Sequence, residues 1–168
     1  MNKNILLTLT KLFWLPVTFI VFMLIIGCCN IAFSLDLYMF GVKPQNLKGL
    51  YGIVMFPLIH GSWEHLFGNL FGLIPLFLIV FFLFKRVSHS IFWFSWITPG
   101  LIVWIIGKDS YHIGASGMVY SFAFFVFTWG VINRNKSCTA LSLAIILLFS
   151  GIFTGVFPLE KGISWEGH

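Results

Sequence analysis

The sequence predicts an all-α membrane protein, a polytopic bundle in which five helices cross the bilayer and a sixth begins. Of the 168 residues, 59% are hydrophobic and only 9% are charged, whereas soluble domains average about 25% charged residues. Five stretches without charge reach the roughly 20 residues that a helix needs to cross the hydrocarbon core. Aromatic residues make up 19% of the chain, which suits side chains that face lipid. The composition excludes an ordinary soluble domain and a disordered chain.

Charged residues and histidines mark the ends of the apolar stretches. They predict transmembrane helices over residues 12–34, 64–84, 90–107, 115–132 and 139–158, and the start of a sixth over 164–168. Pro16 lies near the start of the first stretch, where a helix tolerates proline. Pro75 and Pro99 lie inside the second and third stretches. We expect them to kink these helices, unless neighbouring groups satisfy the freed backbone carbonyls.

The basic residues predict the orientation of the helices. If the N-terminus is cytoplasmic, six of the ten Lys and Arg residues fall on the inner side and four on the outer side, and all five acids lie outside. The positive-inside rule therefore favours a multi-pass membrane protein with a cytoplasmic N-terminus. Residues 36–62 form the long outer connection, which is apolar but broken by glycine. We expect an interfacial or re-entrant segment there.

The cysteines and histidines give no sign of a metal site. Three cysteines are present: Cys28, Cys29 and Cys138. Their spacing fits neither a disulfide framework nor a metal site, and we interpret them as small apolar side chains. An alternative stays open, because LIIGCCN resembles a lipoprotein signal that ends at Cys28. His60 and His112 could bind a metal together with His65, but no HExxH motif is present, so no metal is predicted.

Polar residues from separate predicted helices fall at one depth near the outer face. His65 and Asn69 are four residues apart, so they share one helix face about one turn below that surface. Ser116 begins the fourth apolar stretch at the same face, and His168 lies at the start of the sixth. Each residue alone has a structural interpretation, such as a serine bonded to its own backbone or an asparagine that joins two helices. Because polar groups inside a membrane are costly, their shared depth favours a functional site.

The chemistry that these residues allow is acyl transfer. A serine hydroxyl becomes a strong nucleophile when a nearby base, usually an imidazole, takes its proton. The tetrahedral intermediate needs preorganised donors for its oxyanion, and a side-chain amide, a second imidazole and a backbone N–H could supply them. Small residues at 114–117 would let a substrate backbone or a second helix approach closely.

The motifs resemble those of the rhomboid family of intramembrane serine proteases, in particular its compact bacterial members. The resemblance is carried by GASG followed by MVY at 114–120, by HGSWEHLFGN at 60–69 and by SWEGH at 164–168. It implies a rhomboid-like helical bundle with Ser116 as nucleophile and His168 as general base. Asn69 and His65 would join the Ser116 N–H in the oxyanion hole. Four further residues would support the site, with the tyrosine stacked on the catalytic histidine: Gly114, Gly117, Tyr120 and His60.

The resemblance also implies what the protein does. Such enzymes cleave transmembrane segments of other membrane proteins, so the expected partners are transmembrane substrates and membrane lipid, with no nucleic acid, metal or organic cofactor. A bacterial inner membrane is the expected location. The family continues with a full helix after the catalytic histidine, whereas this sequence stops at His168. We therefore expect the last helix to be missing from these 168 residues.

Two other functions compete with this one. A catalytically inactive rhomboid-like protein would keep the fold and bind transmembrane clients without cutting them, and this alternative stays open. A small transporter or channel subunit would place acids or bases within its spans. None lies between Lys11 and Asp36 or in the later uncharged runs, which disfavours transport. The sequence therefore predicts an intramembrane serine endopeptidase, and it leaves the substrate and the oligomeric state undetermined.

Overall fold

The computed structural model describes residues 3–134, 136–137, 139–140 and 143. It contains five α-helices among these residues: α1 (Lys3–Phe33), α2 (Gly52–Met55), α3 (Trp63–Leu83), α4 (Ser88–Ile106) and α5 (Ser116–Ile132). Three short 3₁₀ helices belong to the α1–α3 connection: η1 (Leu37–Phe40), η2 (Leu47–Gly49) and η3 (Phe56–Leu58). The described residues include no β-strand, which confirms the predicted all-α class. Most of the predicted helix at 139–158, and all of the predicted helix start at 164–168, lie outside the described residues.

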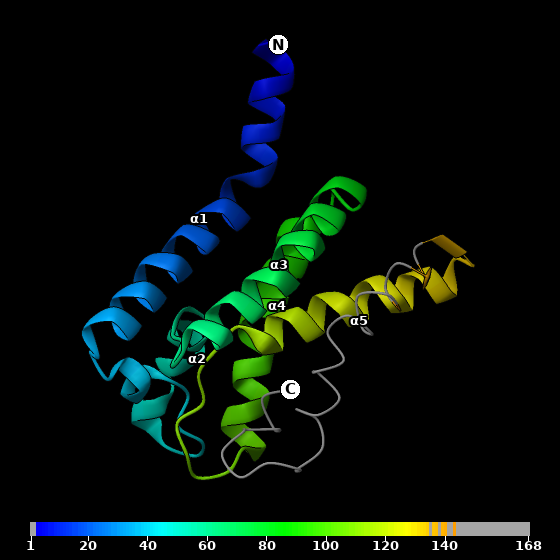
Figure 1. Ribbon diagram of the computed structural model, residues 1–168. Helices are drawn as coiled ribbons and strands as arrows, with labels where there is room; N and C mark the ends of the chain where they lie inside the picture. The colour runs from blue at the N-terminus through cyan, green and yellow to red at the C-terminus, as the bar shows by residue number, and fades with distance from the viewer. Residues whose placement is uncertain (1–2, 135, 138, 141–142, 144–168) are drawn as a thin grey trace.

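The long helices have the length and composition of membrane spans. Three of them are long and apolar enough to cross a bilayer: Thr10–Phe33 within α1, Trp63–Leu83 and Ser88–Ile106. Helix α5 is apolar but shorter. Pro75 and Pro99 lie inside α3 and α4, and both helices continue through them. Helix α1 changes direction in its first half (Figure 1), and Pro16, which lacks the N–H of a helical hydrogen bond, lies inside this helix.

The four long helices meet at a cluster of phenylalanine rings centred on Phe77 of α3. Its ring centroid lies 6.1 Å from that of Phe19 in α1, 5.7 Å from that of Phe92 in α4 and 5.2 Å from that of Phe122 in α5. All four side chains are buried. Aromatic pairs in such tilted or edge-on arrangements contribute about 0.5–1.5 kcal/mol each beyond the area that they bury. Phe77 therefore joins α1, α4 and α5 to α3, and Phe92 of α4 also contacts Phe19 and Phe122.

The connection between α1 and α3 folds as a separate cap on the bundle. Val42, Ile53 and Phe56 pack on Val103 of α4 in a second small core. The indole N–H groups of Trp96 and Trp104 donate to the carbonyls of Val54 and Asn46, at 2.9 and 3.0 Å. Helix α4 therefore holds this connection at one end of the bundle, the same end at which α3 and α5 begin.

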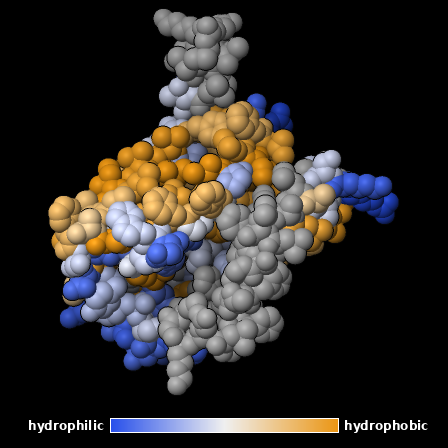
Figure 2. All heavy atoms as spheres, in the orientation of Figure 1, coloured by the Kyte–Doolittle hydropathy of each residue, from blue (hydrophilic) through white to orange (hydrophobic). Residues whose placement is uncertain are grey.

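The surface of the bundle is strongly apolar. Large side chains on several helices are exposed, among them Phe22 of α1, Phe71 of α3 and Phe94 of α4. Figure 2 shows hydrophobic side chains gathered over the body of the helices, and hydrophilic ones at the end where Figure 1 places the α1–α3 connection. Exposed apolar side chains on several long helices are typical of proteins whose helices face lipid.

Replacing Phe77 by alanine should destabilise the whole bundle, because it removes a ring shared by four helices. Truncation of a buried phenylalanine typically costs about 3–5 kcal/mol. Phe71 is the matched control, since it lies on the same helix but is 74% exposed, and its truncation should change stability by about 0.5 kcal/mol or less. Unfolding of the two purified variants in detergent measures both effects. Equal destabilisation would contradict the central role of Phe77.

Candidate active site

The two motifs singled out in the sequence meet at the N-termini of α3 and α5. Ser62 caps α3, because its hydroxyl accepts a hydrogen bond from the His65 N–H at 3.2 Å. Ser116 is the first residue of α5. The strand-like pairing of Val42 with His112 fixes the backbone that leads into α5. The Gly114 N–H then donates to the Phe56 carbonyl at 2.8 Å, which ties the GASG motif to the α1–α3 connection.

Gly114 is in contact with the His65 imidazole. Its backbone has φ +104°, a conformation that residues with a side chain rarely adopt. A Cβ on Gly114 would also overlap Nε2 and Cε1 of His65. Two independent constraints therefore require glycine here. The result is that the ring of His65 lies against the backbone two residues before Ser116.

Ser116 occupies the position in α5 where backbone N–H groups are free for a ligand. The first N–H groups of any helix have no acceptor within the helix, and they favour negative charge. Ser116 is half-buried, and Gly117 after it is buried. The Ser116 hydroxyl forms no hydrogen bond with another described residue. His168, its expected base, lies outside the described residues, so a Ser116–His168 dyad stays a prediction.

His60, His65 and Asn69 form one polar cluster beside Gly114. The Asn69 side-chain nitrogen lies 2.9 Å from the His65 carbonyl oxygen and 3.1 Å from Nε2 of His60. The centroids of the two imidazole rings are 4.9 Å apart. Asn69 is 6% exposed and His60 is fully buried. The sequence prediction that His65 and Asn69 share one face of α3 agrees with this cluster, which also contains His60.

Burial sets the protonation state of His60, which precedes the membrane-spanning part of α3. Removal from water, together with the nearby charge that His65 can carry, lowers the pKa of His60 to about 3, although the Leu58 backbone acts in the opposite direction. His60 is therefore neutral at physiological pH, and one of its two ring nitrogens is free to accept a hydrogen bond.

Asn30 is a member of this cluster that the sequence analysis did not single out. Its side-chain nitrogen donates to the His60 carbonyl at 2.9 Å, and its oxygen accepts from the Leu37 N–H at 2.9 Å. It lies in the last turn of α1 and is buried. In the sequence, the only sign of this role is a polar amide within an apolar stretch. The sequence does not indicate its partners, because they are distant along the chain.

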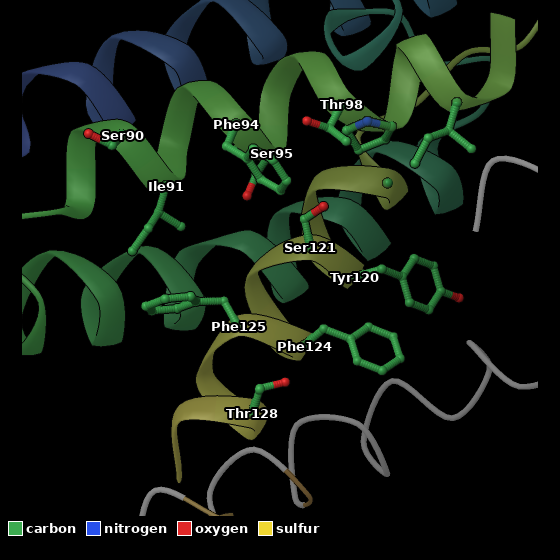
Figure 3. A pocket seen from close by; sticks show the side chains of 13 residues that line it. Ser90, Ile91, Phe94, Ser95, Thr98, Tyr120, Ser121, Phe124, Phe125 and Thr128 are labelled. Atoms are coloured by element: carbon green, nitrogen blue, oxygen red, sulfur yellow. The ribbon is translucent and has the colours of Figure 1, made fainter. Parts of the chain in front are cut away.

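Tyr120 lines an open groove between α4 and α5 (Figure 3). The groove has a volume of about 750 Å³ and extends along α5 from Gly117 to Thr128. Hydroxyl groups line it from both helices: Ser90, Ser95, Thr98, Ser121 and Thr128. The groove thus starts one residue after the expected nucleophile. Its walls are apolar enough for a lipid chain or a helix, and they carry hydroxyl groups at intervals.

The described residues contain no group of three or more His, Cys, Asp or Glu side chains that could hold a metal. Nε2 of His112 lies 3.0 Å from the Lys108 carbonyl oxygen. Cys28 and Cys29 are partly buried near the C-terminal end of α1 as free thiols, and Cys138 lies outside the described residues. The arrangement therefore offers hydroxyl, imidazole, amide and backbone N–H groups for chemistry.

Comparison with known proteins gives relatives for most of the chain. A family model described as Rhomboid domain matches residues 47–168. An uncharacterized protein of Mycobacterium tuberculosis, Rv1337, is 31% identical over 140 residues, which cover 76% of this chain and 57% of that protein. An uncharacterized protein of Mycobacterium leprae, ML1171, is 27% identical over 140 residues, or 76% of this chain and 54% of the relative. The chain thus spans little more than half the length of these relatives. No solved structure matches it significantly.

Gly114→Ala should disrupt the site and destabilise the protein. The left-handed backbone and the overlap with His65 each oppose a side chain, and strain of this kind costs about 1–3 kcal/mol. Gly68→Ala is the matched control, because no atom lies within 4 Å of a Cβ at that position in α3, and alanine favours a helix by up to about 1 kcal/mol. Unfolding in detergent measures both changes. An unaltered stability of the Gly114 variant would contradict the contact with His65.

His60 should make the free energy of unfolding depend on pH. Its pKa in the folded protein is about 3, and that of an unfolded histidine is about 6.5. Between these values the unfolded state binds more protons, so stability is complete above about pH 6.5 and is lost as the pH falls. The slope approaches about 1.4 kcal/mol per pH unit for one proton. Comparing unfolding at pH 7 and pH 5 should give a smaller difference for His60→Gln than for the unsubstituted protein. Equal differences would mean that His60 titrates normally.

Proposed function

The chain belongs to the rhomboid family, and we propose that it is an intramembrane serine endopeptidase that cleaves transmembrane segments of other membrane proteins. The observation that carries the proposal is the contact between the His65 ring and Gly114, two residues before Ser116. This contact joins the HxxxN and GASG motifs, which lie about fifty residues apart in the sequence. Free N–H groups at the start of α5 add donors at the same point.

In the proposed mechanism, the Ser116 hydroxyl attacks the carbonyl carbon of the scissile peptide bond while the His168 imidazole takes its proton. The carbonyl oxygen becomes an oxyanion, which the Ser116 N–H, the Asn69 amide and the His65 ring would stabilise. The C–N bond then breaks, and the imidazolium returns the proton to the leaving amine. Attack of water on the acyl-enzyme, assisted by the same imidazole, releases the second product and restores Ser116.

The expected substrates are helices that expose a peptide bond near the outer membrane face. The proposed site lies where α3 and α5 begin, and glycines lie near both helix starts: Gly68, Gly114 and Gly117. Small residues allow an extended segment to approach a backbone closely. A substrate helix must unwind before its peptide bond can reach Ser116. Helix-destabilising residues near the cut would therefore favour cleavage.

Ser116→Ala should reduce cleavage of a model transmembrane substrate to background, by about a thousandfold or more, because no other group can form the acyl-enzyme. The assay uses the full natural protein in proteoliposomes. Ser110→Ala is the control and should retain activity, since Ser110 is an exposed serine outside the proposed site. Normal cleavage by the Ser116 variant would overturn the proposed mechanism.

The alternative function is an inactive client-binding protein, which would keep the same fold without a serine that a base has activated. A fluorophosphonate probe separates the two functions, because it labels only a serine that a base has activated. We expect labelling of the full protein and none of its Ser116→Ala variant. Absence of labelling in both, together with capture of an intact transmembrane substrate, would favour the client-binding function.

A further inference from the structure

The two N–H groups of the Asn69 side chain point to two different acceptors. One is the His65 carbonyl, which is four residues earlier in α3 and 2.9 Å away. The other is Nε2 of His60, which precedes α3 and is 3.1 Å away. An amide nitrogen carries two hydrogens and can serve both partners at once. Both partners are acceptors, so both select the orientation in which the amide nitrogen, and not its oxygen, faces them.

This arrangement fixes the tautomer of His60. Because the Asn69 nitrogen is a donor, Nε2 of His60 must accept, and the ring proton must reside on Nδ1. A protonated His60 would present a second donor and would repel the amide. The fold holds the ring in place, since His60 is fully buried, packs edge-on against His65 and has its carbonyl bound by Asn30 of α1.

We propose that His60 is a positioning residue for the protease reaction, in which its Nε2 orients the Asn69 amide so that the amide nitrogen is available to the oxyanion. This inference rests on the proposed function. The His60 bond is the longer of the two, and its partner lies off the helix, so its N–H is the one that can be shared with a substrate oxygen. An oxyanion is a charged and therefore stronger acceptor than a neutral imidazole nitrogen, which favours sharing in the transition state.

Loss of this acceptor should act on the chemical step. Without Nε2 of His60, one Asn69 N–H loses its partner and the amide can rotate away from the reacting oxygen. Removing a single oxyanion donor lowers kcat by about 10²–10³-fold, and a misplacement of about 1 Å can cost about 100-fold. We therefore expect a decrease in kcat of about 10–100-fold, with KM almost unchanged because ground-state binding does not use the oxyanion contact.

A matched pair of variants in the full natural protein tests the inference. Gln and Met have similar length and shape, but only Gln carries a strong acceptor near the position of Nε2. His60→Met should show the 10–100-fold decrease in kcat, and His60→Gln should retain most of the activity. His60→Leu replaces His60→Met if the latter does not fold, and unfolding in detergent reports on folding. Equal losses in the Gln and Met variants would overturn the inference and assign His60 a purely structural role.

A double-mutant cycle with Asn69 shows whether His60 acts through that residue. Asn69→Ala should lower kcat on its own, and adding His60→Met to it should cause no further decrease. If the decreases in kcat of the two single variants multiply in the double variant, His60 does not act through Asn69. That result would overturn the positioning role and leave the proposed protease function intact. If the unsubstituted protein and Ser116→Ala give the same cleavage, the proposed function fails, and this inference fails with it.

Discussion

The close approach of the α5 N-terminus to the α3 N-terminus is the constraint on which the rest of the site depends. It exists because Gly114 has a left-handed backbone and no side chain where the His65 ring lies. The hydrogen bond from Gly114 to Phe56 holds the same turn from the other side. A bulkier or more regular turn would separate Ser116 from the polar face of α3. One glycine thus determines whether two motifs far apart in sequence form a single site.

The polar cluster adjoins the main apolar core, which includes Leu58, Leu66 and Ala115. Phe77 and its aromatic partners join the four long helices farther along α3 and α5, away from the N-termini of these two helices. Buried amides and imidazoles are costly unless they are hydrogen-bonded. Asn30 and Asn69 use their side-chain nitrogens for this purpose. The fold can therefore hold polar groups at membrane depth without losing its core.

The sequence predicts the fold class well because uncharged stretches of about 20 residues have few alternatives to a transmembrane helix. It also predicts that His65 and Asn69 share a face, since helical spacing alone requires this. It could not predict that His60 accepts from Asn69, or that Asn30 binds the His60 carbonyl. Both contacts depend on the path of residues 34–62, which short 3₁₀ turns and tryptophan hydrogen bonds determine. Such irregular segments have no periodicity from which contacts follow.

The α1–α3 connection consequently has a role beyond linking two helices. Through His60 it contacts the Asn69 amide, through Phe56 it holds Gly114, and through Asn30 it is attached to α1. Each contact joins the connection to a different helix, so a displacement of this segment would move the proposed oxyanion donors relative to Ser116. Catalytic geometry is sensitive to shifts of about 1 Å. Residues outside the proposed site, such as Asn30, can thus influence the proposed reaction through the backbone that carries His60.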